Sequence, residues 1–295
     1  TSSAFWNLGS SLCDPFITNI LWTRYVYFFQ KKNIIDMKSK LIQKIKRAYG
    51  LFKTIGLKNT CPICSWSARY FYDAGFDFPV LKKYKIISAG FRHNVRCPRC
   101  NSSERERLIY LFLKRKTKTF LNNSSILHVA PEKSLQKVLK KRRHGTHVSV
   151  DINSPFADIV ADIQAIPYGD HSFDVIICSH VLEHVPDDLK AMREFVRVLK
   201  LGGIAILQVP YSPILKETYE DWSVTLPVER ERVFGQTDHV RIYGTDYPDR
   251  LSIAGFKVET ILPHTFLTKK EIVRYSLNPE ESVFFCSLKS DKKNL

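Results

Sequence analysis

Short apolar runs alternate with helix-like segments between residues 126 and 210, and this alternation constrains the fold more than any other feature of the chain. The runs begin at Ile126, Val148, Phe173 and Ile204, and a segment with a helical period of apolar residues follows the first and the third. Runs that alternate in this way build parallel sheets through helical crossovers. We therefore expect an α/β fold with a doubly wound sheet that carries helices on both faces.

Asp151 ends the second of these runs, about 20 residues after the loop that follows the first. In a doubly wound sheet, an acidic residue at this place binds the ribose of an adenosine cofactor. One carboxylate has two acceptor oxygens, which match the two hydroxyls of a vicinal diol. The position of Asp151 thus predicts a nucleoside-containing cofactor at the carboxyl edge of the sheet.

Five strings resemble the Rossmann-like class I methyltransferases that use S-adenosylmethionine, in particular the type 11-like group: Ile-Leu-His-Val-Ala-Pro-Glu (126–132), Val-Ser-Val-Asp (148–151), Ala-Asp-Ile (161–163), Ser-Phe-Asp-Val-Ile-Ile-Cys-Ser-His-Val-Leu-Glu-His-Val (172–185) and Leu-Gly-Gly-Ile-Ala-Ile-Leu-Gln-Val-Pro (201–210). The resemblance covers residues 125–289. It implies a seven-stranded, mainly parallel sheet whose last two strands, at 255–258 and 282–288, form an antiparallel hairpin. It also implies that S-adenosylmethionine is bound by residues around the strand ends: His128, Ala130, Glu132, Asp151, Asp162, Ile163, Ser179 and His180.

The turn after the first strand departs from the family pattern. Ala130-Pro131-Glu132 replaces the customary glycines, and His128 stands where an acidic residue is common. Glu132 at the start of a helix disfavours a phosphate but is compatible with the ammonium group of S-adenosylmethionine. A Rossmann-like domain that has lost its cofactor remains the alternative.

Four of the seven cysteines form two Cys-x-x-Cys pairs, with 32 residues between the pairs. Two such turns complete a shell of four thiolates for a structural Zn²⁺, formed by Cys61, Cys64, Cys97 and Cys100. Residues 70–72 and 80–81 are candidates for a hairpin inserted into this zinc-ribbon-like module. Two disulfides or redox pairs are the alternatives, although nothing in the sequence indicates secretion.

The catalytic candidates are histidines, because methyl transfer to a hydroxyl or amine needs a base. His180, His184 and His239 are the candidates, and we favour His239 with Asp238 or Glu220 beside it. Residues 211–244 form a predicted substrate lid, with these substrate-binding candidates: Glu220, Gln236, Asp238, Arg241 and Tyr243. An ordinary charged surface loop is the alternative.

The pair Glu183-His184 resembles a segment of ubiquinone-pathway O-methyltransferases, some of which bind a divalent metal there. The further acidic ligand of those enzymes would fall at His180. The alternative is that His184 caps and packs the start of a helix.

The formal charge of +16 is concentrated in the N-terminal part. Residues 1–125 hold 23 Lys/Arg and 6 Asp/Glu, a net charge of +17, whereas residues 126–289 hold 20 and 22, a net charge of −2. This asymmetry favours an anionic partner, such as nucleic acid, lipid head groups or a phosphorylated substrate. A solvated lysine-rich surface is equally compatible with it.

We expect six segments along the chain: a leader at 1–36 that is either disordered or a non-native extension upstream of a start at Met37, a basic amphipathic helix at 37–58, the four-cysteine module at 59–104, a connecting helix and linker at 105–124, the methyltransferase domain at 125–289 and a tail at 290–295. The apolar stretch from Phe16 to Phe29 contains Arg24 and is too short to span a bilayer. It also lacks the order of a signal peptide, so we expect a cytoplasmic protein. The basic helix could lie on an anionic membrane or pack on the body of the protein.

Residues 59–288 are similar to a bacterial group that joins a paired Cys-Pro-x-Cys module to this methyltransferase domain. Many of its members resemble enzymes that modify sugars or surface-glycan precursors, so a small-molecule acceptor is expected. The alternatives are an RNA methyltransferase that uses the basic module to hold RNA, and a scaffold without catalysis. No Asn-Pro-Pro-Tyr-type tetrapeptide follows the fourth strand, which disfavours the RNA alternative. No sequence feature specifies the oligomeric state.

Overall fold

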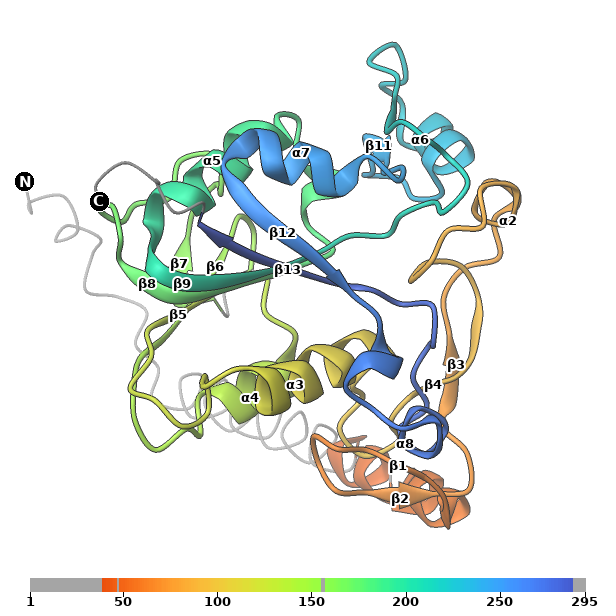
Figure 1. The fold of residues 1–295 in the computed structure, drawn as a ribbon. Coiled ribbons are helices and arrows are strands. Elements are labelled where there is room, and N and C mark those ends of the chain that lie inside the picture. The colour runs from red at the N-terminus through yellow and green to blue at the C-terminus, as the bar shows by residue number, and fades with distance from the viewer. Residues whose placement is uncertain (1–38, 47, 155–156, 289–295) are drawn as a thin grey trace, which may run out of the picture. The chain divides into compact units, whose positions relative to one another are not determined.

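The computed structural model of the chain describes residues 39–46, 48–154 and 157–288 (Figure 1). The predicted leader at 1–36 and the tail at 290–295 lie outside these residues. The chain divides into two compact units, one up to Lys53 and the other from Thr54 onward.

The first unit contains the predicted basic helix, which is helical at residues 39–46 and 48–54. The prediction placed its end at Lys58, but strand β1 (Ile55–Thr60) begins directly after Thr54, so the helix is shorter. Its large apolar side chains, including Leu41 and Phe52, are exposed. Among the described residues, no helix combines the length and the apolar character needed to cross a bilayer.

The second unit is built around a sheet of seven strands, in the order β12-β13-β9-β8-β5-β6-β7. Strands β9, β8, β5, β6 and β7 are parallel to one another. Strand β13 runs antiparallel to both β9 and β12. The sequence-based prediction of a seven-stranded, mainly parallel sheet with a final antiparallel hairpin is therefore confirmed. The strands are β5 (Ile126–Val129), β6 (His147–Asp151), β7 (Ile159–Val160), β8 (Phe173–Ser179), β9 (Leu199–Gln208), β12 (Phe256–Ile261) and β13 (Val283–Leu288).

Helices cover both faces of this sheet (Figure 1). Side chains alternate between the faces along each strand. In β8, Val175 and Ile177 pack with the helices α3 (Glu104–Lys116) and α4 (Lys133–Leu139), whereas Ile176 and Cys178 pack with α5 (Asp188–Val198) and α7 (Tyr247–Ala254). A strand that is buried on both faces needs an unbroken apolar run, which is why the sequence signal was strong here.

The cysteine module consists of two small antiparallel pairs and a short helix. Strand β1 pairs with β2 (Ser67–Ala68), and β3 (Tyr72–Ala74) pairs with β4 (Arg92–Arg96). The predicted hairpin is partly wrong, because residues 80–81 belong to helix α2 (Pro79–Lys83) rather than to a strand. Pro79 occupies the first turn of α2, where its fixed φ favours a helix start.

The lid segment (residues 211–244) carries β10 (Tyr219–Glu220), α6 (Pro227–Phe234) and β11 (Arg241–Ile242). Helix α2 packs against it through Leu81, which meets Phe234 in a small apolar cluster. Backbone contacts join the same two parts, since the N–H of Ile87 donates to the carbonyl of Tyr211 at 2.9 Å. The remaining elements are the 3₁₀ turns η1 (Leu182–His184) and η2 (Pro263–Thr265) and helix α8 (Lys269–Arg274).

Candidate functional site

Asp151 lies at the carboxyl end of β6, next to the ends of β5 and β7. Its Oδ1 accepts hydrogen bonds from the backbone N–H groups of Asn153 and Ser154, both at 2.8 Å. These two bonds hold the carboxylate at the edge of the sheet where a doubly wound fold binds its nucleoside.

The turn after β5 adopts a glycine-like backbone without a glycine. Ala130 has a φ of 42°, in the left-handed region, and its N–H donates to the carbonyl of Val150 at 2.8 Å. A left-handed backbone costs an L-residue about 1–2 kcal/mol, so the surrounding contacts must hold Ala130 in it. After this turn, Glu132 occupies the N-cap position of α4.

His128 is fully buried, and both of its ring nitrogens have partners inside the protein. Nδ1 lies 3.2 Å from Nε2 of His147, and Nε2 lies 3.1 Å from Oε2 of Glu132. Burial works against ionisation of Glu132, but the hydrogen bond and charge of His128, a backbone hydrogen bond and the charge of Arg105 together lower the pKa of this carboxyl. The predicted direct contact between His128 and the cofactor does not fit this burial, and His128 positions Glu132 instead.

Three other predicted cofactor residues lie on the same edge in different environments. Asp162 accepts hydrogen bonds from the backbone and side-chain amides of Gln164. Ile163 is only 5% exposed and belongs to the core under the sheet, which leaves little of it for the expected contact with an adenine ring. The Oγ of Ser179 is buried and has no hydrogen-bond partner among the described residues.

His180 follows β8 with a φ of 57° and forms a pair with Glu183. Its Nδ1 lies 3.2 Å from Oε1 of Glu183, while its Nε2 is buried without a partner in the described part of the chain. Burial, with the positive charge of Arg105, lowers the pKa of His180 to about 4. Because Nδ1 faces a carboxylate, it carries the proton, and Nε2 is left as the acceptor nitrogen.

The predicted partners of His239 turn out to bind other residues. Asp238 Oδ2 lies 3.2 Å from Nδ1 of His184, and Glu220 Oε1 lies 2.6 Å from Nε of Arg241. His239 instead packs edge-on against the ring of His184, with 4.6 Å between ring centroids. Among the described residues no hydrogen bond joins His239 to Asp238 or Glu220, and its assignment as the base stays a prediction.

Arg241 and Tyr243 are buried supports of the lid segment rather than exposed contacts for a substrate. The guanidinium of Arg241 donates to Glu220 and to the backbone carbonyls of Leu182, Val185 and Pro186. The Tyr243 hydroxyl donates to Asp188 at 2.8 Å. With their polar groups engaged inside the protein, neither side chain fits the substrate-binding role predicted for it. Gln236 donates to Asp238 at 2.9 Å.

A cavity of about 360 Å³, here called the acceptor cavity, brings several predicted residues together. Its wall includes all three candidate histidines and residues from three distant parts of the second unit: His180, Glu183, His184, Gln236, His239, the 88–90 loop, Arg92, Arg96 and Arg105. The three arginines were missed by sequence reasoning. Their only signal was the basic charge of the N-terminal part, which does not say where they fold.

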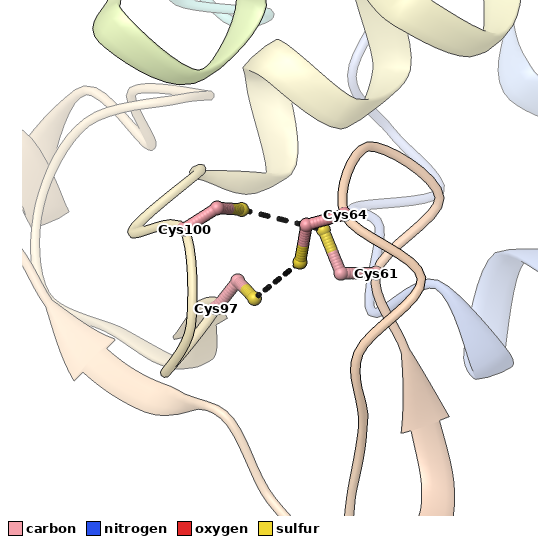
Figure 2. A group of neighbouring side chains, drawn as sticks. All are labelled: Cys61, Cys64, Cys97 and Cys100. Atoms are coloured by element: carbon pink, nitrogen blue, oxygen red, sulfur yellow. Dashed lines mark hydrogen bonds between the residues drawn. The ribbon is translucent and has the colours of Figure 1, made fainter. Parts of the chain in front are cut away.

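The four paired cysteines converge at one place in the module (Figure 2). Sγ of Cys61 lies 3.6 Å from Sγ of Cys100, and Sγ of Cys64 lies 3.6 Å from Sγ of Cys97. A tetrahedral zinc with Zn–S bonds of about 2.3 Å needs sulfurs about 3.8 Å apart. The thiolate set therefore fits Zn²⁺ in both chemistry and spacing.

Both Cys-x-x-Cys turns have the same local backbone. The residue after each pair, Ser65 or Asn101, has a positive φ of 59° or 62°, and its N–H donates to the backbone carbonyl of the first cysteine of the pair at 2.8 Å. Ser102 Oγ lies within hydrogen-bond distance of Cys61 and Cys100. Such second-layer contacts orient metal-binding sulfurs.

Residues 115–207, from the end of α3 to β9, match the family model described as a methyltransferase domain. A demethylmenaquinone methyltransferase of Corynebacterium efficiens is 28% identical over 103 residues, which are 32% of this chain and 45% of that protein. The ubiquinone/menaquinone biosynthesis C-methyltransferase UbiE of Idiomarina loihiensis is 38% identical over 71 residues, 23% of this chain and 28% of that protein. The chain thus spans less than half the length of these curated relatives.

Among solved structures, a protein of Thermotoga maritima described as an S-adenosylmethionine-dependent methyltransferase aligns with a TM-score of 0.38 and 20% identity, over 63% of this chain and 91% of that chain. Residues 115–207 are thus similar to a methyltransferase domain, and the seven-stranded, mainly parallel sheet that contains them fits a Rossmann-like fold.

Proposed function

We propose that the protein is an S-adenosylmethionine-dependent methyltransferase whose acceptor is a small polar molecule, of the sugar or surface-glycan precursor class. The observation that carries this proposal is the position of His180. It follows β8 at the carboxyl edge that bears Asp151, and it also forms part of the wall of the acceptor cavity. A cofactor held along that edge would have its methyl group next to the cavity.

The cavity wall supports a polar acceptor. Arg96 and Arg105 contribute positive charge, and among the described residues Arg105 forms no ion pair and only a 3.4 Å hydrogen bond to the carbonyl of Ser88. An acceptor with hydroxyl groups and an anionic group matches such a lining better than an isoprenoid chain does.

The curated relatives named above are quinone methyltransferases, but the similarity says little about the acceptor. The family match ends at residue 207 and begins at residue 115. Arg92, Arg96, Arg105, Gln236 and His239 all lie outside that range. The matched part therefore contains the proposed cofactor residues, and most of the wall of the acceptor cavity lies outside it.

The residues present can perform an in-line methyl transfer. The acceptor hydroxyl gives its proton to Nε2 of His180, which Glu183 holds in the required tautomer. When bound, S-adenosylmethionine would supply the methyl group: the acceptor oxygen would bond to the methyl carbon, and the electron pair of the broken carbon–sulfur bond would stay on sulfur. Asp151 and Glu132 would hold its ribose and its ammonium group.

Calorimetric titration with S-adenosylmethionine tests the cofactor half. We expect Asp151→Ala to bind the cofactor about 10- to 100-fold more weakly, since a charged acceptor of two hydrogen bonds is lost. Asp170→Ala is the matched control, because that carboxylate is exposed and pairs with Arg197. Equal binding by wild type and Asp151→Ala, or no binding by either, would refute the proposal.

The four-cysteine set is proposed to hold a structural Zn²⁺. With four thiolates no coordination position is left for a substrate, so this ion serves the fold of the module. The same module contributes the 88–90 loop to the acceptor cavity. In this proposal the zinc acts on catalysis only by holding one wall of that cavity.

An RNA acceptor is the second candidate, favoured by the basic N-terminal part. Its signature is a steep loss of RNA affinity as salt rises, with methylation of RNA in a cell extract. Transfer to a small polar product without RNA methylation supports the first candidate.

A further inference from the structure

We propose that Glu183, His184 and His239 form a binding site for a divalent transition-metal ion on the wall of the acceptor cavity. One possible ligand atom from each residue lies within 4.8 Å of the others. Metal–ligand bonds of about 2.0–2.2 Å need ligand atoms about 3.0–3.5 Å apart, which small side-chain rotations achieve from this starting geometry. The binding site is inferred from this geometry alone. A role for the ion in catalysis depends on the proposed methyl transfer.

Glu183 supplies the clearest sign that a ligand is expected here. The residue is 1% exposed, and its Oε1 contacts His180. Its other oxygen, Oε2, is buried and has no hydrogen-bond partner among the described residues. A buried carboxylate oxygen without a partner is costly, and a cation beside it removes that cost.

His184 has the arrangement of a metal-bound imidazole. Its Nδ1 contacts Oδ2 of Asp238 at 3.2 Å, which leaves Nε2 as the nitrogen for the ion. A carboxylate behind a metal-binding histidine fixes the ring orientation and raises its basicity. The sequence placed Asp238 beside His239, whereas the structure gives it this supporting place behind His184.

His239 is held against the other two ligands by the lid segment. The N–H of the next residue, Val240, donates to the carbonyl of Glu183 at 3.0 Å. Arg241 adds hydrogen bonds to three carbonyls on either side of His184. These hydrogen bonds therefore fix His239 of the lid segment relative to Glu183 and His184 of η1 before any ion binds.

The donor set indicates the class of ion. Two imidazoles and one carboxylate suit Zn²⁺, Fe²⁺, Mn²⁺ or Co²⁺, whereas Mg²⁺ and Ca²⁺ prefer oxygen ligands. Three protein ligands leave coordination positions open, and all three residues belong to the cavity wall. An acceptor hydroxyl bound at such a position would lose its proton more readily.

Titration with Co²⁺ tests the site on the full chain, after the thiolate site has been filled with one equivalent of Zn²⁺. We expect one further equivalent of Co²⁺ with weak visible bands and without the sulfur-to-cobalt charge-transfer band of a thiolate site. His239→Ala and Glu183→Gln should lose this equivalent and keep the zinc. Asp238→Asn should weaken Co²⁺ binding about 10- to 100-fold. His264→Ala is the matched control, since that histidine is exposed and distant in sequence.

The retained zinc equivalent shows that each variant is folded around its module. No second equivalent in the wild type, or full Co²⁺ uptake by His239→Ala, would overturn the proposal. Cofactor binding is measured on the same samples. Loss of S-adenosylmethionine binding with intact Co²⁺ uptake would refute the proposed function and leave the metal site standing.

A separate observation concerns the helix of the first unit, and we infer that it binds an anionic lipid surface. Five large apolar residues share one face of it at 3.6 residues per turn: Leu41, Ile42, Ile45, Tyr49 and Phe52. This apolar stripe is 52–71% exposed at each position.

The charges of the helix fit a membrane interface. Lys40, Lys44, Lys46 and Lys53 flank the apolar stripe or lie opposite it, and residues 39–54 contain no Asp or Glu. A basic polar face with an aromatic and aliphatic stripe is the composition of interfacial helices. RNA would engage the lysines but would leave the stripe in water, so lipid is the better match.

Co-sedimentation of the full chain with phosphatidylcholine vesicles, with and without phosphatidylglycerol, tests this inference. We expect binding only to the anionic vesicles, at least tenfold weaker for Phe52→Asp and about fivefold weaker for Lys44→Gln. Leu201→Asp is the control, because Leu201 is a 79% exposed leucine outside the helix. Unchanged vesicle binding by Phe52→Asp would overturn the inference. So would RNA binding or self-association through this helix without vesicle binding.

Discussion

Glu281 links the cysteine module to the sheet and should make the stability of the protein fall as pH rises. It lies just before β13, is 2% exposed, and accepts a hydrogen bond from the hydroxyl of Ser88. Burial raises the pKa of Glu281 to about 7, and the positive charges of Arg105 and Arg92 offset only part of that effect. The protonated carboxyl is thus the form that the folded state prefers.

The size and sign of the effect follow from proton linkage. The pKa of Glu281 rises from 4.5 in the unfolded chain to about 7 in the folded one. At about 1.36 kcal/mol per pKa unit, this difference is worth about 3 kcal/mol. Because the folded state binds the extra proton, the contribution is fully present below pH 4.5 and is lost as pH rises through 7.

Urea unfolding of the full chain between pH 5 and pH 8 measures this contribution. Glu281→Gln keeps a hydrogen-bonding group in the same space but cannot ionise, so its stability relative to wild type should rise by about 2.5 kcal/mol from pH 5 to pH 8. Glu280→Gln is the matched control, since this neighbour is exposed. A difference between Glu281→Gln and wild type that does not change with pH would refute the reasoning.

Three further perturbations test other parts of the structure. Arg107→Met should lower the free energy of unfolding by about 3–5 kcal/mol in urea titrations, because it leaves four buried or partly buried backbone carbonyls without their guanidinium donor; a loss under 1 kcal/mol would contradict this. Gly235→Ala should lower the thermal midpoint, since Gly235 has a φ of 87° and an added Cβ would lie 2.4 Å from Cδ2 of Leu81; an unchanged midpoint would show that α2 and α6 separate freely. Cys97→Ser should remove one zinc equivalent in elemental analysis and lower cofactor-dependent activity while calorimetric S-adenosylmethionine binding persists; full zinc retention would exclude the four-thiolate site.

The cofactor edge could be predicted because its signals are local in the sequence. Strands buried on both faces need continuous apolar runs, and a carboxylate at the end of such a run can only lie at the carboxyl edge of the sheet. Asp151 was placed there from these facts alone. His128 was misjudged because its partner His147 lies 19 positions away on the neighbouring strand. Strand order shows that β5 and β6 pair, but it does not show which side chains satisfy each other.

The lid segment was misread for a related reason. Its density of Glu, Arg, His and Tyr predicted an open polar pocket, yet Arg241 donates to carbonyls 55–59 residues away and becomes part of the core. A polar side chain in such a segment can bind a ligand only if its hydrogen-bonding groups are not already bonded to the protein's own backbone. His239 differs from Arg241 because it lies close to Glu183 and His184, and Oε2 of Glu183 has no hydrogen-bond partner in the described part of the chain.

The acceptor cavity lies mostly outside the part of the chain that the family model matches. Its wall combines the 88–90 loop of the module, the start of α3 and the lid segment, which the family match leaves out. Leu81 and Ile87 fasten the module to the lid segment, so changes in either part would reshape the cavity without touching Asp151. Exchanging the module and the lid segment should therefore alter which acceptor is methylated and leave S-adenosylmethionine affinity unchanged. A chimera that lost cofactor binding while its sheet stayed folded would show that the two halves are not separable.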